Sequence, residues 1–432
     1  MGIGVAVRTA NERGLPGILQ GRDLFRPLLL LMACILAVGW MQVGSLLNQR
    51  QPDAGVYYYA AELDDALYRG TVEKPFMPSG GLPFTYTPFA AALFRLVDVI
   101  PFPGFTVLWA CLNMIAVVAV VLLAGRSWSR AWQAFAAVVA CCSTIAAAHV
   151  MMGQLNALLL LLVVVDLAPR ARGGGGALPR GIGIGVATSI KLTPAIAILF
   201  LLCARRYRDA AVAAATAAVC FIVGTIAYPR STADFFRQLP RLSERVDVLG
   251  YASTFQNTGI SGVLAQLGMP VPTVLVGTVV VVCGLLVALR IRRNGGALVA
   301  LWLSLVACLA TPVTWIHHWI ALPIALVAAL RQERRRWCRS VLGVLLATQL
   351  TGSVYVNSVL QGVGPPALTA LIALTPVLGA ITVGIVLSRG ARRQDEDMSA
   401  RLERSPARDR LPATGSRACV RGRNPARTAA QA

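Results

Sequence analysis

The chain has 432 residues, of which 56% are hydrophobic and only 14% are charged, and its mean hydropathy is +0.66. A soluble domain of ordinary composition carries about 25% charged residues, so a chain this apolar needs lipid to cover part of its surface. The net charge of +21 is typical of nucleic-acid-binding proteins, but arginines that gather on one side of a membrane give the same excess, and we expect no nucleic-acid partner.

The cysteines do not suggest a disulfide framework. Eight of the ten lie inside apolar stretches, where cysteine behaves as a small apolar residue. No Cys-x-x-Cys pair is present. We expect neither a cofactor nor a bound metal ion.

Ten segments are apolar enough to cross a membrane, which takes roughly 20 residues of helix. The predicted spans are 25–46, 104–124, 131–151, 154–168, 209–228, 273–289, 297–313, 318–330, 341–358 and 367–387. No small-residue cleavage site follows the first of them, so we expect no cleaved signal peptide. The sequence predicts an all-helical integral membrane protein.

The arginines predict the orientation of these spans. They cluster before the first span and in the connections at 126–130, 170–180, 205–208, 290–293 and 331–339. Alternate crossings place all of these on one face, which the positive-inside rule makes cytoplasmic, if residues 181–204 enter and leave on the same side. We therefore predict a re-entrant pair of half-helices broken near Lys191, cytoplasmic termini in the plasma membrane, and contact with anionic lipids of the inner leaflet.

Two long loops, 47–103 and 229–272, fall on the outer face. In the first, the apolar stripe Val56, Ala60, Leu63 and Leu67 has helical spacing and predicts a helix lying in the membrane interface. Its tyrosines, Tyr57, Tyr58, Tyr59 and Tyr68, would then lie at headgroup depth. Residues 84–99 predict a second interfacial helix.

The chain is expected to divide into three parts. Residues 1–24 form a cytoplasmic N-terminal segment, residues 25–388 a polytopic membrane domain, and residues 389–432 a basic cytoplasmic tail without apolar periodicity, which we predict to be disordered.

Asp53 is the first candidate for chemistry. It stands in the outer loop directly before the tyrosines, among the other acids of that loop, which are Glu62, Asp64, Asp65 and Glu73. Aspartate is also a favoured N-cap, so Asp53 can serve as a cap, as a functional carboxylate, or as both.

Two adjacent histidines, His317 and His318, stand at the outer mouth of a predicted span. Neighbouring residues of a helix point in different directions, so we expect one imidazole to face a cavity and not a two-histidine metal site. The alternative is an interfacial belt of these histidines with Trp315 and Trp319. We expect His149 to be a buried residue of the bundle.

Lys191 is the one lysine of the membrane region, and an ammonium ion buried there needs an anionic partner or must extend to the interface. Four outer-face amides complete the polar set: Gln154, Asn156, Gln256 and Asn257. They can bind sugar hydroxyls, or they can satisfy helix ends.

Several short sequence motifs, taken in order along the chain, resemble those of a known family. They are Asp53-Ala-Gly-Val-Tyr57, Phe84-Thr-Tyr-Thr-Pro-Phe89, Gly153-Gln-Leu-Asn156, Lys191-Leu-Thr-Pro194, Asn257 with Gly262, and Thr311-Pro-Val-Thr-Trp-Ile-His-His-Trp319. The set resembles the actinobacterial GT-C type glycosyltransferases of family GT87, which are polyprenol-phosphate-mannose-dependent alpha-mannosyltransferases. The resemblance covers roughly residues 25–390.

This resemblance implies transfer of a mannosyl residue from a polyprenyl-phosphate donor to a lipid-linked cell-envelope glycan on the outer face. Asp53 matches the family's first-loop aspartate and would be the general base of an inverting reaction that gives an alpha-mannoside. Candidates for holding the donor phosphate are Lys191, His317, His318, Arg241 and Arg245. Candidates for binding the sugars or the prenyl chain are Tyr57, Tyr86, Gln154, Asn156, Asn257, Trp315 and Trp319.

Two alternatives remain at this stage. Arabinofuranosyl transfer from a polyprenyl-phosphate donor would use the same kind of site. A transporter without chemistry would share the bundle and the intramembrane lysine, although no internal repeat is visible in the sequence.

Overall fold

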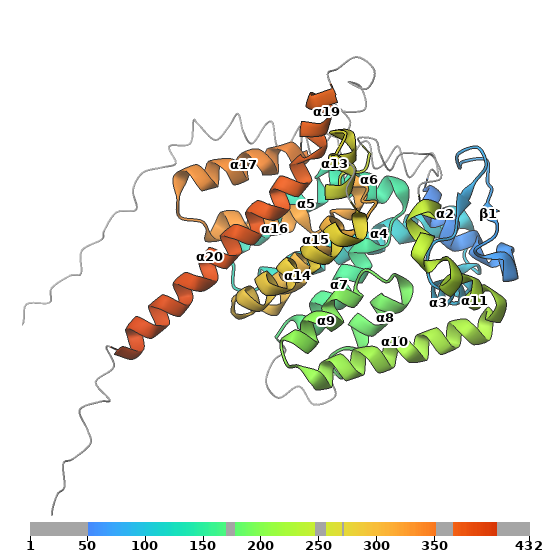
Figure 1. Cartoon of the computed structure of the whole chain (residues 1–432), viewed down its shortest axis with the longest axis horizontal. Helices are drawn as coiled ribbons and strands as arrows, with labels where there is room; N and C mark the ends of the chain where they lie inside the picture. The colour runs from blue at the N-terminus through green and yellow to red at the C-terminus, as the bar shows by residue number, and fades with distance from the viewer. Residues whose placement is uncertain (1–50, 170–177, 247–255, 270–271, 351–365, 404–432) are drawn as a thin grey trace, which may run out of the picture. The chain divides into compact units, whose positions relative to one another are not determined.

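The computed structural model of the chain describes residues 51–169, 178–246, 256–269, 272–350 and 366–403 (Figure 1). The predicted first span at 25–46 and the N-terminal segment lie outside these residues. The described part is built almost wholly of helices, as the composition predicts, with one two-stranded antiparallel sheet of β1 (Thr71–Val72) and β2 (Leu82–Pro83).

The body of the protein consists of the longer apolar helices. These are α4 (Phe102–Ala124), α5 (Arg130–Cys141), α6 (Thr144–Met152), α7 (Asn156–Leu167), α8 (Ile182–Ile190), α9 (Ala195–Cys203), α10 (Tyr207–Ala227), α14 (Thr273–Ile291), α15 (Gly296–Ala310), α16 (Leu322–Gln332), α17 (Arg336–Leu350), α19 (Pro366–Ala373) and α20 (Thr375–Glu403). Helix α4 packs on α7, α8 on α10, and α14 on α15.

Shorter elements complete the described residues. In the first outer loop they are α2 (Pro52–Tyr59), η1 (Ala60–Ala66), α3 (Pro88–Phe94) and η2 (Arg95–Val97). In the second they are α11 (Pro229–Gln238), η3 (Leu239–Arg241), α12 (Leu242–Val246) and α13 (Ile260–Gln266). The last two are η4 (Arg292–Asn294) and η5 (Ile316–His318).

Four helices of the described part are long and apolar enough to cross a membrane: Phe102–Ala124, Tyr207–Ala227, Thr273–Asn294 and Ala370–Ser399. The pair α5 and α6, bent by 52° at the break between them, makes a fifth if it forms one span. On α10, the large apolar side chains of Val219, Ile222 and Ile226 are exposed, as expected of a helix that faces lipid. The protein is therefore an all-helical membrane protein.

Three predicted spans correspond to shorter helices, namely α7, α15 and α16. Each is shortened at the end where polar residues gather. Helix α7 begins only after the turn at Gly153, α15 stops at Thr311, and α16 begins after η5. The count of ten spans remains a prediction.

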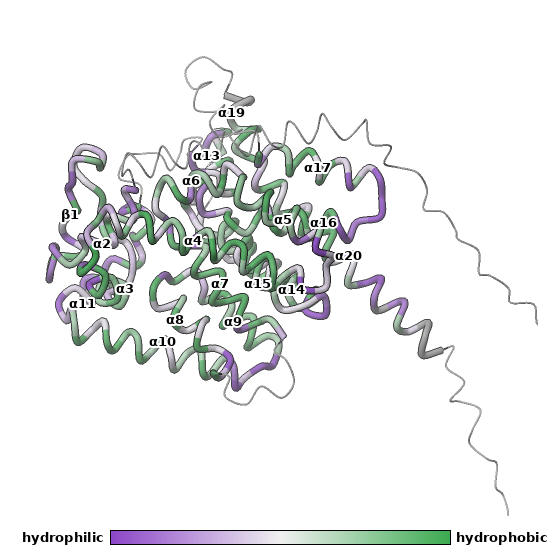
Figure 2. Tube along the Cα trace, turned by 180° about the vertical axis from the view of Figure 1, so that it is seen from behind, coloured by the Kyte–Doolittle hydropathy of each residue, from purple (hydrophilic) through white to green (hydrophobic). Residues whose placement is uncertain are grey.

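Polar segments gather at two ends of the body (Figure 2). At one end the arginine-rich connections contact one another: Arg126 donates to the carbonyl of Pro169 at 2.8 Å, and the Arg331 guanidinium lies over the Trp128 ring. At the other end lie α2, α3 and α11, where Arg69 pairs with the buried Asp234 of α11 at 2.7 Å. The two sets of loops predicted to lie on opposite faces are thus separated.

The break predicted near Lys191 is present. Helix α8 ends at Ile190, Lys191 is extended (φ −141°, ψ 136°), and α9 begins only after Pro194. Proline cannot donate a backbone hydrogen bond and disfavours helix in the residue before it. The hydroxyl of Thr87 caps the end of α8 by donating to the carbonyl of Ser189, and the same oxygen caps α3 by accepting from the amide of Ala90 at 3.3 Å.

Gly153 ends helix α6 in the left-handed conformation (φ +73°). Its amide bonds to the carbonyl of Val150, and that of Gln154 bonds back to the carbonyl of His149, both at 3.0 Å, which is the Schellman pattern. A Cβ at Gly153 would lie 2.5 Å from the Cβ of Ala54 in α2. Only glycine allows both the turn and this close approach, which fixes Gln154 beside α2.

Three expectations need correction. The stripe residues Val56, Ala60 and Leu67 are buried in the protein and do not face the interface, and Tyr57 and Tyr68 are core residues, 0% and 1% exposed. The outer loop folds back on α4 and α11 and thereby covers them. The tail is helical up to Glu403 within α20, since opposite charges such as Arg392 and Glu396 recur four residues apart. Residues 404–432 lie outside the described part.

Gly153→Ala should destabilise the protein more than Gly268→Ala. Gly268 has nearly the same φ (+70°) but nothing within 4 Å of its added Cβ, so it isolates the conformational cost of about 1 kcal/mol. Gly153→Ala adds overpacking against α2, worth roughly 1–3 kcal/mol more. Thermal unfolding in detergent would measure the difference, and equal losses in the two variants would contradict the role of the close approach.

Candidate active site

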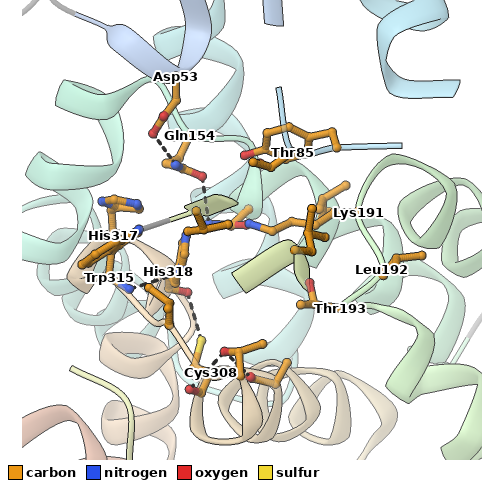
Figure 3. Close-up of a pocket in the computed structure, with 18 of the residues that line it drawn as sticks. Asp53, Thr85, Gln154, Lys191, Leu192, Thr193, Cys308, Trp315, His317 and His318 are labelled. Atoms are coloured by element: carbon orange, nitrogen blue, oxygen red, sulfur yellow. Dashed lines mark hydrogen bonds between the residues drawn. The ribbon is translucent and has the colours of Figure 1, made fainter. Parts of the chain in front are cut away.

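A cavity of about 870 Å³ lies between the first outer loop and helices α7, α9 and α15 (Figure 3). Its lining includes six of the polar candidates, of which the first four are joined by hydrogen bonds: Asp53, Gln154, Asn156, Lys191, His317 and His318. Its remaining wall is mostly apolar, with Leu159, Leu160 and Val163 of α7 and Ala300, Leu303 and Ala307 of α15. The cavity is therefore amphiphilic.

Asp53 lies in the first turn of α2 and lines the cavity. The N-cap of α2 is Gln51, so Asp53 is not the cap that the sequence allowed. Its Oδ2 atom accepts a hydrogen bond from the side-chain amide of Gln154. Burial raises the pKa of the Asp53 carboxyl from 3.8 to about 6, against the opposing effects of this hydrogen bond and of the Lys191 charge. A carboxylate with such a pKa is poised to take up a proton near neutral pH.

Lys191 lines the cavity from the break between α8 and α9. Its Nζ atom donates to Oδ1 of Asn156 at 3.1 Å and lies 5.5 Å from the centroid of the Tyr86 ring. Within the described residues no ion pair joins Lys191 to Asp53. The ammonium ion therefore faces the cavity beside an amide and an aromatic ring, and does not reach out to the interface.

The two histidines both border the cavity. Nδ1 of His318 accepts a hydrogen bond from the backbone amide of Trp315 at 3.3 Å, so a neutral His318 carries its proton on Nε2. His317 is 8% exposed, and its Nε2 atom has no hydrogen-bond partner among the described residues. Both imidazoles can thus take part in binding a ligand in the cavity.

His149 is fully buried, as expected. Its Nδ1 donates to the backbone carbonyl of His317 at 3.1 Å, and its Nε2 lies 3.0 Å from Oδ1 of Asn113. It does not line the cavity. This histidine anchors the η5 turn to α6 and α4.

The aromatic candidates divide in two. Tyr86 and Trp315 line the cavity. Tyr57 does not: it is fully buried, stacks on Phe94, and its hydroxyl lies 2.7 Å from that of Tyr86. Trp319 is also fully buried, and its indole N–H donates to the Thr258 hydroxyl at 2.9 Å. Tyr57 and Trp319 thus support the wall and do not touch the cavity.

Asn257 is likewise taken up by the loops, contrary to the expectation that it contacts substrate. Its Oδ1 accepts from the amides of Gly259 and Thr314, at 3.2 and 2.9 Å, and its Nδ2 donates to the carbonyl of Pro312. It joins the second outer loop to the segment that carries the histidines. Gly262 is necessarily glycine here, because a Cβ would lie 2.3 Å from the Asn257 side chain.

The two arginine candidates, Arg241 and Arg245, belong to elements that border the cavity but are not among its lining residues. Arg245 donates to the backbone carbonyls of Leu67 and Gly70, at 3.5 and 2.9 Å. It therefore ties α12 to the first outer loop.

Some lining residues were not among the sequence candidates. Thr85, Ser304 and Thr311 contribute polar groups to the wall. Thr85 neighbours a candidate residue in the sequence, but no spacing rule distinguishes it. Gln256 of the second outer loop, one of the candidate amides, also lines the cavity. In the part of the chain that the structure describes, no group of three His, Cys, Asp or Glu side chains is arranged to hold a metal ion.

Comparison with known proteins identifies the family. Residues 84–314, more than half of the chain, match Glycosyltransferase family 87. The chain is 29% identical over 281 residues to a polyprenol-phosphate-mannose-dependent alpha-(1-2)-phosphatidylinositol mannoside mannosyltransferase of Mycobacterium tuberculosis, a match covering 59% of this chain and 64% of that protein. The protein of the same name from Mycolicibacterium smegmatis is 29% identical over 71% of this chain and 76% of its own length.

A second kind of relative is the polyprenol-phosphate-mannose-dependent alpha-(1-2)-phosphatidylinositol pentamannoside mannosyltransferase of Mycolicibacterium smegmatis, 28% identical over 73% of this chain and 77% of its own length. No solved structure matches the chain. The resemblance that the short sequence motifs indicated is thereby confirmed: the chain belongs to glycosyltransferase family 87.

Proposed function

We propose that the protein is a membrane glycosyltransferase that moves a mannosyl residue from polyprenyl-phosphate-mannose to a lipid-linked glycan of the cell envelope. The observation that carries the proposal is the amphiphilic cavity, with a raised-pKa carboxylate and an ammonium ion among its lining groups. The names of the relatives support the donor and suggest a phosphatidylinositol mannoside as acceptor.

In the proposed reaction, Asp53 acts as the general base. It takes the proton of an acceptor hydroxyl while the hydroxyl oxygen bonds to the anomeric carbon of mannose. The bond from that carbon to the phosphate oxygen breaks, and polyprenyl phosphate leaves with the electron pair. Attack opposite the leaving phosphate inverts the anomeric centre, so a beta-linked donor gives an alpha-mannoside.

The leaving phosphate gains negative charge, which nearby donors and cations stabilise. Lys191 offers an ammonium group that makes one side-chain hydrogen bond, to Asn156, within the described residues. His318 offers Nε2–H if neutral, and the Nε2 atom of His317 has no partner among the residues that the structure describes. These three residues are the proposed phosphate site, whereas the bonds of Arg245 to the first outer loop favour a structural role for that residue.

The apolar wall suits a prenyl chain. Its residues on α15 run from Ala300 to Cys308, a rise of about 12 Å along a helix. Tyr86, whose ring centroid lies 5.5 Å from Nζ of Lys191, and Trp315 line the cavity, where aromatic rings can stack on the sugar. The cavity thus has room for both ends of a lipid-linked sugar.

We further propose that the chain crosses the plasma membrane ten times, with a re-entrant element at α8 and α9 and with cytoplasmic termini. The separation of arginine-rich connections from the cavity's polar residues supports an outer active site and an inner face that contacts anionic lipids. In this topology residues 25–388 form the catalytic domain and 389–432 a cytoplasmic tail.

Asp53→Asn should abolish mannosyl transfer while donor binding and folding persist. The amide cannot accept the proton, but it keeps the shape of the carboxyl. The matched control is Asp64→Asn, the same change of carboxyl to amide at an exposed residue of the same loop that does not line the cavity. Transfer from labelled polyprenyl-phosphate-mannose in membranes would measure both variants, and an active Asp53→Asn would refute the assignment of the base.

The rate should fall as the pH drops through about 6. The base works only when ionised, and its raised pKa means that protonation sets in near pH 6 and not near pH 4. Below this pH, kcat/KM should decrease by about tenfold per pH unit. A profile that stays flat down to pH 4.5, with the protein shown to be folded, would contradict the role of Asp53.

Lys191→Ala should raise the KM for the donor at least tenfold, because the phosphate loses its cation. Lys74→Ala is the matched control, since Lys74 is the other lysine of the chain and pairs with Glu62 on the outer loop at 2.9 Å. Steady-state kinetics with varied donor concentration would distinguish them. An unchanged donor KM in Lys191→Ala would exclude a phosphate contact.

A further inference from the structure

Three hydrogen bonds in series connect Lys191 to Asp53 (Figure 3). Nζ of Lys191 donates to Oδ1 of Asn156 at 3.1 Å, Nδ2 of Asn156 donates to Oε1 of Gln154 at 3.3 Å, and Nε2 of Gln154 donates to Oδ2 of Asp53. The two amides therefore stand between the cation and the carboxylate and touch both.

The chemistry of Lys191 and Asp53 at the two ends fixes the direction of this series of hydrogen bonds. An ammonium group only donates hydrogen bonds, and an ionised carboxylate only accepts them. If either amide were flipped, it would present its NH₂ group to the ammonium ion or its oxygen to the carboxylate. Every link thus has one allowed orientation, and all three donate towards Asp53, so that each bond polarises the next.

At the two ends of this hydrogen-bond series, the charged groups keep positions that are open to ligands. Oδ1 of Asp53 has no hydrogen-bond partner in the described part of the protein, and Asn156 is the one side chain there that accepts from Lys191. One carboxylate oxygen and two ammonium protons therefore remain for ligands. The amide groups, in contrast, use an oxygen and a nitrogen each within the chain.

The local fold places both amides. Gln154 follows the left-handed Gly153, whose carbonyl accepts from the indole N–H of Trp109 at 2.9 Å. Asn156 is the first residue of α7. A helix start and a helix end thus hold the two side chains side by side at the edge of the cavity.

We infer that Gln154 and Asn156 are positioning residues that link the cation at Lys191 to the base at Asp53, and not contacts to sugar hydroxyls. The inference rests on the proposed function, since it assigns Asp53 and Lys191 their roles in transfer. A positioned carboxylate matters because a small misplacement of a reacting group costs up to about 100-fold in rate.

The test compares Gln154→Ala, Asn156→Ala and the isosteric Gln154→Glu and Asn156→Asp by steady-state kinetics and pH profiles. The alanine variants should lower kcat by about 10- to 100-fold, leave donor and acceptor KM within about twofold, and move the acidic limb of the profile to higher pH. Gln154→Glu should move that limb furthest, because it removes the donated bond and places a second carboxylate beside Asp53. Asn156→Asp keeps the acceptor for Lys191 and loses only the middle link, so it should still lower kcat.

Two comparisons complete the design. Gln349→Ala, which removes another buried amide outside the cavity, should change neither kcat nor the pH profile. In the double variant of Lys191→Ala with Asn156→Ala, the loss in kcat should be clearly smaller than the product of the two single losses. The reason is that both substitutions interrupt the same series of hydrogen bonds.

A raised KM with unchanged kcat and pH profile in the Gln154 and Asn156 variants would overturn the inference and return them to substrate binding. Unchanged kinetics in all four variants would overturn it as well. The Asp53→Asn variant distinguishes a failure of this inference from a failure of the proposed function. If the Gln154 and Asn156 variants contradict the inference while Asp53→Asn is inactive, only the linking role fails. If Asp53→Asn is active, the assignment of the base fails as well.

Discussion

The site depends on holding a carboxylate and an ammonium ion in one partly apolar cavity without letting them meet. A charged group in such surroundings is costly unless it is hydrogen-bonded. A direct ion pair would satisfy both charges and occupy both with each other. The two amides between Lys191 and Asp53 satisfy one position of each charge and, within the described residues, leave the others open to the cavity.

Several features of the backbone and of the loop contacts support this arrangement. The glycine turn at Gly153 brings α6 against α2, and the proline break after Lys191 frees that side chain from helix α8. The Thr87 hydroxyl joins the first outer loop to the end of α8, and Asn257 joins the second outer loop to the η5 segment. Each of these residues belongs to a different stretch of the chain, so the cavity forms only when the outer loops are docked on the bundle.

Much of this arrangement was predictable from the sequence. Apolar stretches predicted the helices, arginines predicted the two-ended distribution of charge, and Pro194 predicted the break at Lys191. The polar residues Asp53, Gln154, Asn156 and Lys191 were recognisable as costly groups, and the structure brings all four to the cavity.

The direction in which a side chain points was not predictable in the same way. Tyr57, Asn257 and Trp319 have the right chemistry for sugar binding, yet tertiary packing turns them into the loops. The predicted starts of two helices differ from the structure by a few residues for a related reason: α7 begins after the turn at Gly153, and α16 begins after η5. The series of hydrogen bonds from Lys191 depends on distances between loops, which no spacing in the sequence reveals.

The most direct measurement of the central claim uses the purified full chain in lipid bilayers. Polyprenyl-phosphate-mannose labelled at the anomeric carbon is supplied with a phosphatidylinositol mannoside acceptor, and the product linkage is determined by NMR. The account predicts transfer to the acceptor with an alpha configuration, dependent on Asp53. A beta-linked product, or release of free mannose without transfer by folded protein, would contradict it.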